Sequence, residues 1–262
     1  MKKDTIDHGR YFDWGKVSED YLRYRDIYPE IFYQKIVEQG LCTKGQKVLD
    51  LGTGTGVLPR HLYRFGAEFV GVDLAENQIV QARQCSAAQG MEIQYVVSSA
   101  EDISFPDNTF DVVTACQCFM YFDKAVLIPK LWRLLKPAGR LAVLFLAWLP
   151  DESEIAKQSE ALVLRYNPSW TGGNMQRYEL KTPQWLMGLF EVESKHAYDI
   201  QLNFTRESWN GRMKACRGIG ASLPEESVAA FDAEHMALLR DIAPQQFEIP
   251  HYATMLVLTV KK

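Results

Sequence analysis

Short apolar runs alternate with helical patterns over the first 150 of the 262 residues. Runs rich in Val, Leu and Ile predict strands, and the segments between them space apolar residues as on one helix face. We expect helices at 30–40, 57–65, 77–88 and 124–135, and strands at 47–51, 68–72, 92–97, 110–116 and 140–147. Because both faces of these strands are apolar, a parallel sheet covered on both sides by helices is expected.

The alternation changes after residue 149. Helices are expected at 151–166, 182–190, 205–216 and 224–242, a loop at 167–178, and strands at 192–204 and 247–260. The fold class is therefore α/β, with a doubly wound, mostly parallel sheet of seven strands. The late helical insertions predict a cap.

Composition and charge narrow the class of protein. The chain is 47% hydrophobic and 24% charged, and its formal net charge is −4, which argues against a general nucleic-acid binder. The longest apolar run, 141–149, is too short for a membrane helix, and no signal-peptide pattern precedes it. The five cysteines lack disulfide or metal-ligand spacing, so we expect reduced thiols in the cytoplasm. Cys116 and Cys118 are either small core residues or a reactive or metal-binding pair.

A glycine-rich turn carries the most informative chemistry. Residues 48–56 read Val-Leu-Asp-Leu-Gly-Thr-Gly-Thr-Gly, a strand that runs into glycines and then a helix. Glycines let the backbone approach a ligand, and the helix start offers free N–H groups. The spacing differs from the dinucleotide fingerprint and from the phosphate loop. A purely structural turn is the alternative reading.

Asp73 ends the next strand, about twenty residues past the glycines. A carboxylate at this place accepts hydrogen bonds from both hydroxyls of a ribose. An acidic residue that ends a strand also serves as a cap or turn residue. In combination with the glycine turn, the ribose role is the one we predict.

These motifs resemble those of class I S-adenosylmethionine-dependent methyltransferases of the type 11 family, which includes quinone-biosynthesis and trans-aconitate methyltransferases. The resemblance covers about 21–147. Its motifs, in order, are the Tyr-Arg-Tyr-Pro-like segment 21–29, the glycine turn 50–56, the strand end 70–73, the segments 99–102, 105–106 and 110–113, and the run 134–141. It implies a Rossmann-like fold with an antiparallel last strand, and S-adenosylmethionine as the cofactor.

The resemblance also implies the roles of individual residues. The methionine part of the cofactor is assigned to Asp50, Gly52 and Gly54, and the ribose to Asp73. The adenine is assigned to Leu74, Ser99, Ala100 and Glu101, with backbone groups contributing at Ser99, where many relatives carry Asp. On this basis, residues 1–150 form a cofactor-binding core with an N-terminal lid segment. Residues 151–262 supply the helical cap and the last two strands of the same sheet.

The acceptor side departs from the family pattern. Gln117 is kept and is expected where cofactor and acceptor meet, but Met120 stands where a subgroup carries His, so no imidazole base is available there. The catalytic residues are therefore left unassigned. Candidates for the acceptor pocket are Tyr24, Arg25, Tyr121, Trp148 and Trp170. The aromatic residues after position 147 equally suit a small core of the insertion.

The function expected is methyl transfer to a small-molecule acceptor. A methyltransferase acting on RNA or protein, and a non-enzymatic S-adenosylmethionine-binding protein, are the alternatives. The five histidines show no metal-ligand spacing, so no metal is expected; His251 stands out because it opens the last strand. The identity of the acceptor, the atom methylated and the oligomeric state, a homodimer included, are left open.

Overall fold

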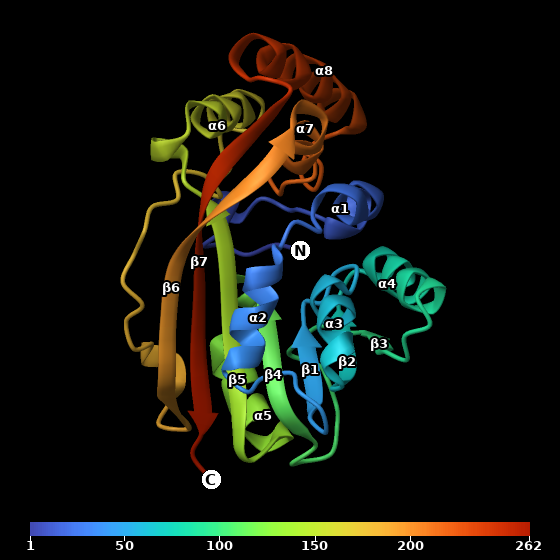
Figure 1. The fold of residues 1–262 in the computed structure, drawn as a ribbon, viewed down its shortest axis with the longest axis vertical. Coiled ribbons are helices and arrows are strands. Elements are labelled where there is room, and N and C mark those ends of the chain that lie inside the picture. Colours follow the sequence, from blue (N-terminus) through green and yellow to red (C-terminus); the bar gives the residue numbers. More distant parts are fainter. The chain divides into compact units, whose positions relative to one another are not determined.

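Seven strands form one sheet in the order β3-β2-β1-β4-β5-β7-β6 (Figure 1). The computed structural model describes residues 1–262. The strands are β1 Lys47–Leu51, β2 Glu68–Asp73, β3 Gln94–Val97, β4 Phe110–Cys116, β5 Leu135–Trp148, β6 Phe190–Thr205 and β7 Gln246–Val260. The helices are α1 Ser18–Tyr24, α2 Glu30–Glu38, α3 Val57–Leu62, α4 Glu76–Ala88, α5 Lys124–Leu134, α6 Glu154–Tyr166, α7 Arg206–Lys214 and α8 Glu225–Ile242.

The predicted fold class is confirmed. The pairs β1–β2, β1–β4, β2–β3 and β4–β5 are all parallel. The arrow of β7 points opposite to those of β1 and β4 in Figure 1, so the last strand is antiparallel to them. No helix of the structure has the length and apolar character that a membrane crossing needs.

The prediction of a helix at 182–190 is wrong. Only a short 3-10 helix, Gln184–Leu186, forms in this segment. Met187 and Gly188 follow it with φ angles of 53° and 71°, in the left-handed region that a right-handed helix cannot continue through. The apolar spacing of the segment therefore reflects partial burial of a loop.

The chain divides into two compact units. Unit 1 comprises Met1–Ile27, Ala147–Tyr178 and Asp199–Tyr252, and unit 2 comprises Tyr28–Leu146, Glu179–Tyr198 and Ala253–Lys262. The division predicted at residue 150, the N-terminal lid and the cap role of the later helices stay predictions.

Unit 2 contains the parallel core of the sheet. Its central strands are buried along nearly their whole length, as the continuous apolar runs predict. Helix α2 lies across β4 and β5 in Figure 1, and the Arg140 guanidinium on β5 donates to the carbonyls of Gln39 and Gly40 just after that helix, both at 2.7 Å. These bonds satisfy carbonyl groups that the end of a helix leaves open.

Unit 1 has a helical core of its own, built from α1, α6, α7 and α8. Helix α7 begins with a capping box between Thr205 and Ser208, and its Trp209 is fully buried. The Trp209 indole donates to the Ser159 hydroxyl on α6 at 2.9 Å, and His235 on α8 bonds the same hydroxyl at 2.9 Å. The three helices therefore meet at one satisfied polar centre inside an apolar core.

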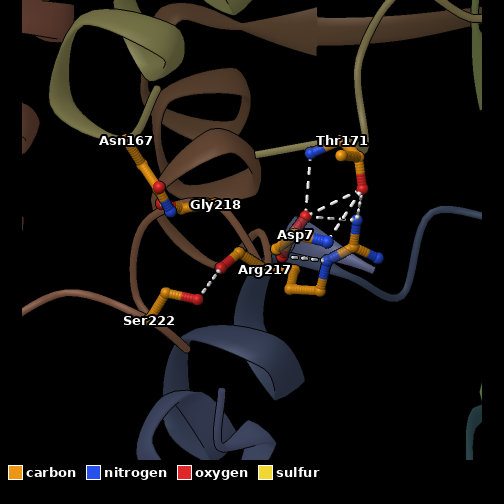
Figure 2. Close-up of polar contacts among 6 residues, drawn as sticks. All are labelled: Asp7, Asn167, Thr171, Arg217, Gly218 and Ser222. Atoms are coloured by element: carbon orange, nitrogen blue, oxygen red, sulfur yellow. Dashed lines mark hydrogen bonds and ion pairs between the residues drawn. The ribbon is translucent and has the colours of Figure 1, made fainter. Parts of the chain in front are cut away.

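A buried ion pair ties three distant segments of unit 1 together. Figure 2 shows the Asp7 carboxylate between Thr171 and Arg217. Arg217 Nε donates to Asp7 Oδ2 at 2.6 Å, and the backbone N–H of Thr171 donates to Asp7 Oδ1 at 2.8 Å. Burial raises the pKa of Asp7, but the bonds from Arg217 and Thr171 outweigh it and hold this pKa below its usual value. The N-terminal segment is thereby fixed to the loop at 167–178.

We expect Asp7→Asn to lower the free energy of unfolding by about 2 kcal/mol, because it leaves the Arg217 charge buried without its counter-charge. Asparagine keeps the shape of the side chain and tolerates the left-handed backbone at this position, where φ is 48°. The matched control is Glu207→Gln, which breaks the exposed Arg23–Glu207 pair and should cost at most about 1 kcal/mol. Denaturant unfolding measures the free energy of unfolding of both variants. Equal losses would contradict the larger contribution expected of the buried pair.

Candidate functional site

Four strands of unit 2 end at the same edge of the sheet. In the parallel register, Leu51 of β1 lies opposite Val72 of β2 and Ala115 of β4, and Asp73 lies opposite Val97 of β3. The loops that leave these strands therefore start side by side. In open α/β sheets ligands bind at this carboxyl edge.

The glycine turn after β1 needs its glycines for two reasons. Gly52, Gly54 and Gly56 have φ angles of 62°, 56° and 74°, a region that other residues adopt at a cost. Neighbouring side chains also fill the space of a Cβ: one at Gly52 would lie 2.7 Å from Cys118 Cβ, and one at Gly56 would lie 2.3 Å from Tyr95 Oη. The turn is thus held tightly against the protein.

The Asp73 carboxylate is fixed by backbone N–H groups. Its Oδ2 accepts from Gly54 N and its Oδ1 accepts from Ala75 N, both at 2.9 Å. Burial raises the pKa of this carboxyl although these hydrogen bonds oppose the shift. Because each carboxylate oxygen accepts more than one hydrogen bond, acceptor capacity is left for a ligand. The bond to Gly54 joins the ends of β1 and β2 directly.

Asp50 lies beneath the turn as a buried carboxyl, with an exposed fraction of 2%. The Thr114 hydroxyl on β4 donates to its Oδ1 at 2.6 Å. Burial raises the pKa of Asp50 to about 7, and the charge of Asp73 adds to the shift while the Thr114 bond opposes it. A carboxyl group with a pKa raised in this way loses its proton readily when a cation binds beside it.

The residues assigned to the adenine follow β2 and β3. Leu74 is 52% exposed, an open apolar surface directly after Asp73, whereas Ala100 is buried. The Ser99 hydroxyl donates to Asp102 Oδ2 at 2.6 Å, and Glu101 Oε1 accepts from Asp123 N at 2.7 Å. The backbone N–H of Ser98 donates to the Asp73 carbonyl at 3.0 Å, which keeps this segment beside the end of β2.

Gln117 turns the chain sharply after β4. Its φ is 65°, its N–H donates to the Leu144 carbonyl at 3.0 Å, and its side-chain amide donates to the Leu146 carbonyl. Tyr121 is buried, and Met120 is exposed. Gln117 therefore lies at the same carboxyl edge as the glycine turn, while its role toward cofactor and acceptor stays a prediction.

The other acceptor-pocket candidates belong to unit 1. The Tyr24 ring packs on α7 where Gly211 leaves room for it, and the Arg25 guanidinium lies 5.0 Å from the Tyr21 ring. Trp170 is buried against Gly218, and the Trp148 indole donates to Glu160 Oε1 at 2.5 Å. All four have well-defined packing roles inside unit 1, and their contact with an acceptor stays a prediction.

Sequence reasoning missed two residues that shape the site. The first is Thr114, which bonds Asp50. It is the one hydroxyl residue in the buried run Val-Val-Thr-Ala of β4, and that position in the sequence could have indicated a partner for Asp50. Cys118 donates from its thiol to the Leu51 carbonyl at 3.0 Å, and no pattern in the sequence indicates this contact.

Residues 49–143 match the family model of a methyltransferase domain. A demethylmenaquinone methyltransferase of Thermus thermophilus is 38% identical over 42% of this chain and 52% of its own length. A ubiquinone biosynthesis O-methyltransferase of Xanthomonas euvesicatoria is 32% identical over 48% of this chain and 54% of its own length. The matched segment thus spans about half the length of these relatives.

Solved structures share the fold. The YcgJ protein of Bacillus subtilis superposes with a TM-score of 0.55 at 19% identity, over 89% of this chain and all of that one. The sheet order and this superposition show a Rossmann-like α/β fold. Over the matched segment, the chain is similar to type 11 methyltransferases.

Proposed function

We propose that the protein transfers the methyl group of S-adenosylmethionine to a small-molecule acceptor. The observation that carries this proposal is the bond from Gly54 N to Asp73 Oδ2 at 2.9 Å, which joins the glycine turn to a carboxylate that would accept from a ribose. The tight backbone turn, the exposed Leu74 and the buried Asp50 fit the remaining parts of a cationic nucleoside.

The chain's own residues would bind and orient the cofactor. Asp73 would accept from the ribose hydroxyls, Leu74, Ser99, Ala100 and Glu101 would surround the adenine, and Asp50 with Gly52 and Gly54 would face the methionine part. The bound cofactor supplies a methyl group that its sulfonium already activates. The protein then has to hold the acceptor in line, with about 3 Å between the reacting atoms, and exclude water.

The relatives support a small-molecule acceptor, because one is named for demethylmenaquinone and another for ubiquinone biosynthesis. The net charge of −4 supports neither RNA nor another polyanion as the acceptor. We propose the cytoplasm as the compartment, since the five cysteines are free thiols.

We expect S-adenosylmethionine to bind and NAD not to bind, because the glycine turn lacks the spacing that cradles a pyrophosphate. Isothermal calorimetry with both cofactors measures this. Tight NAD binding without S-adenosylmethionine binding would overturn the cofactor proposal.

Turnover is tested by the release of S-adenosylhomocysteine in the presence of a metabolite library. Release with a metabolite supports the proposed reaction. Cofactor binding without release from any metabolite, protein or RNA would instead indicate a non-enzymatic binding protein, and release only with RNA or protein would indicate a macromolecular acceptor.

A further inference from the structure

Strand β3 ends the sheet on one side and has an open edge. It is the first strand in the order β3-β2-β1-β4-β5-β7-β6 and pairs with β2 alone (Figure 1). The N–H of Ser98, just after the strand, donates to the Asp73 carbonyl of β2 at 3.0 Å. Backbone groups of successive residues point to opposite sides of a strand. The even-numbered residues of β3 therefore face β2, whereas Tyr95 and Val97 direct their backbone groups outward.

A side-chain contact from α4 shows the same direction. Arg83 Nη2 donates to the outward carbonyl of Tyr95 at 2.8 Å. A carbonyl oxygen has two lone pairs, so this oxygen can accept a second hydrogen bond in the plane of the sheet. The edge thus offers the N–H and C=O groups of Tyr95 and Val97 to a further strand.

The two edges of the sheet differ in charge. β6, the strand at the opposite edge, carries Glu191, Glu193 and Lys195 in its first half. β3 reads Gln-Tyr-Val-Val and has no charged residue. Natural sheets protect their edges with charged side chains, because an uncharged edge readily pairs with another chain. β6 is therefore protected against the addition of a strand, and β3 lacks this protection.

Val97 projects from the open edge as an exposed apolar side chain. Ile93 and Tyr95 pack against Ile79 and Ala82 of α4. Because side chains alternate between the two faces of a strand, Val97 lies on the same side of the sheet as Ile93 and Tyr95. Its exposed fraction is 43%, so this side chain has little packing of its own within the chain.

A hollow lies at the other end of the same edge. Its volume is about 440 Å³, and it is lined by the end of α4 and the start of β3, with Ala87, Met91 and Ile93 as its apolar part. Ile93 precedes Tyr95 by two residues, and Val97 follows it by two. The edge therefore has a projecting apolar side chain on one side of Tyr95 and an apolar hollow on the other.

We propose that two copies of the protein pair through β3, with the strands antiparallel and a two-fold axis at Tyr95. In this register Tyr95 lies opposite Tyr95 of the other copy, and Val97 lies opposite Ile93 of the other copy. Each of these pairs exchanges two backbone hydrogen bonds, so all the outward groups of the edge are satisfied together. The Val97 side chain of each copy enters the hollow beside Ile93 of the other.

The self-complementary edge favours a second copy over an unrelated peptide. A two-fold axis makes every contact twice, so both hollows are filled and both Val97 side chains are buried. An unrelated strand would fill one hollow and leave the positions of the second set of contacts to chance. Paired strands of this length are small beside the roughly 1,200–2,000 Å² that stable interfaces bury. The dimer is therefore expected to exchange with the monomer at micromolar concentrations.

Sedimentation equilibrium of the full-length protein tests the association, from low micromolar to several hundred micromolar protein. We expect a reversible equilibrium between monomer and dimer, with no larger species, because pairing uses up the open edge. A monomer at every concentration would overturn the proposal. The measurement needs no cofactor, so its outcome is independent of the proposed methyl transfer.

Variants locate the interface. Val97→Lys places a charge on the projecting side chain, and Ala87→Trp fills the hollow. Each is expected to raise the dissociation constant of the dimer at least tenfold, with circular dichroism as the check on folding. The matched control is Val126→Lys on α5, where the wild-type valine is 48% exposed and lies outside the edge. Association as strong as wild type in both folded edge variants would refute the assignment.

Disulfide cross-linking tests the register without altering Val97 or Ala87. The proposed axis places Gln94 opposite Val96 of the other copy, in a non-hydrogen-bonded pair whose Cα atoms lie about 4.5 Å apart. This distance suits a disulfide, whereas Cα atoms more than about 7 Å apart cannot be bridged. A mixture of the Gln94→Cys and Val96→Cys chains is therefore expected to give a covalent dimer under oxidation.

Each single variant alone, and the wild-type protein with its five native cysteines, is the control and should give no covalent dimer above background. No cross-linked species in the mixture, at a concentration where sedimentation shows the dimer, would overturn the pairing of β3. Cross-linking of either variant alone as strongly as the mixture would refute the two-fold axis at Tyr95.

Discussion

Replacing Asp73 with alanine should weaken S-adenosylmethionine binding by about 10- to 100-fold. The substitution removes two ribose hydrogen bonds that would each contribute about 1 kcal/mol. It also removes the acceptor that holds Gly54 N at 2.9 Å, so the glycine turn loses its link to β2. The fold should persist, because Asp73 ends a strand and does not fill the apolar core.

Isothermal calorimetry measures the affinity, and circular dichroism checks that the variant is folded. Asp111→Ala is the matched control. Asp111 also lies on the sheet, but its carboxylate accepts from Lys47 N and Lys136 Nζ toward the other ends of the strands. Its loss should leave the cofactor affinity unchanged. A folded Asp73→Ala variant with wild-type affinity would refute the ribose assignment.

Cofactor affinity should fall steeply below neutral pH. Burial raises the pKa of Asp50 to about 7, so near neutrality about half of these carboxyl groups carry a proton in the ligand-free protein. A cationic cofactor favours the ionised form, and binding therefore releases a proton. Affinity is expected to be nearly constant above pH 8 and to decrease about tenfold per pH unit below 7, or about 100-fold at pH 5.

Calorimetry in buffers of different ionisation enthalpy measures both the affinity and the number of protons released. Asp73 acts in the same direction, since burial raises its pKa too. The Asp50→Asn variant separates the two carboxyl groups: it should bind more weakly at pH 8 and show a clearly smaller slope between pH 5 and 7. An affinity that is equal at pH 5.5 and pH 8 in the wild-type protein would contradict the proton linkage.

The parts of the fold that were predicted correctly are those that local sequence patterns indicate. The apolar runs of β1, β2 and β4 are continuous because both faces of the strands are buried, and this pattern is visible in the sequence. The glycine turn and Asp73 were recognisable because a tight turn and a strand end require particular residue types at a fixed spacing. The match of residues 49–143 to the family model of a methyltransferase domain confirms the resemblance that these motifs indicated.

Contacts between distant residues account for what was not predicted. Asp7 and Arg217 are separated by 210 residues, and nothing local to either residue indicates the pair. His251 is buried with its Nδ1 2.9 Å from the Ile249 carbonyl and its ring stacked on Phe204, and neither contact is a sequence pattern. The segment after Pro183 failed as a helix because its backbone turns left-handed at Met187.

The contact between Gly56 and Tyr95 also limits the order in which this protein can change during evolution. The Tyr95 hydroxyl, held by Ser86 Oγ at 2.9 Å, occupies the space of a side chain at position 56. A mutation that enlarges residue 56 first would meet a fixed ring, whereas one that shrinks residue 95 first opens the space for it. Even after that change, the φ of 74° at position 56 makes the backbone conformation unfavourable for any residue other than glycine. Substitutions at these two sites are therefore expected in a fixed order, with residue 95 replaced before residue 56.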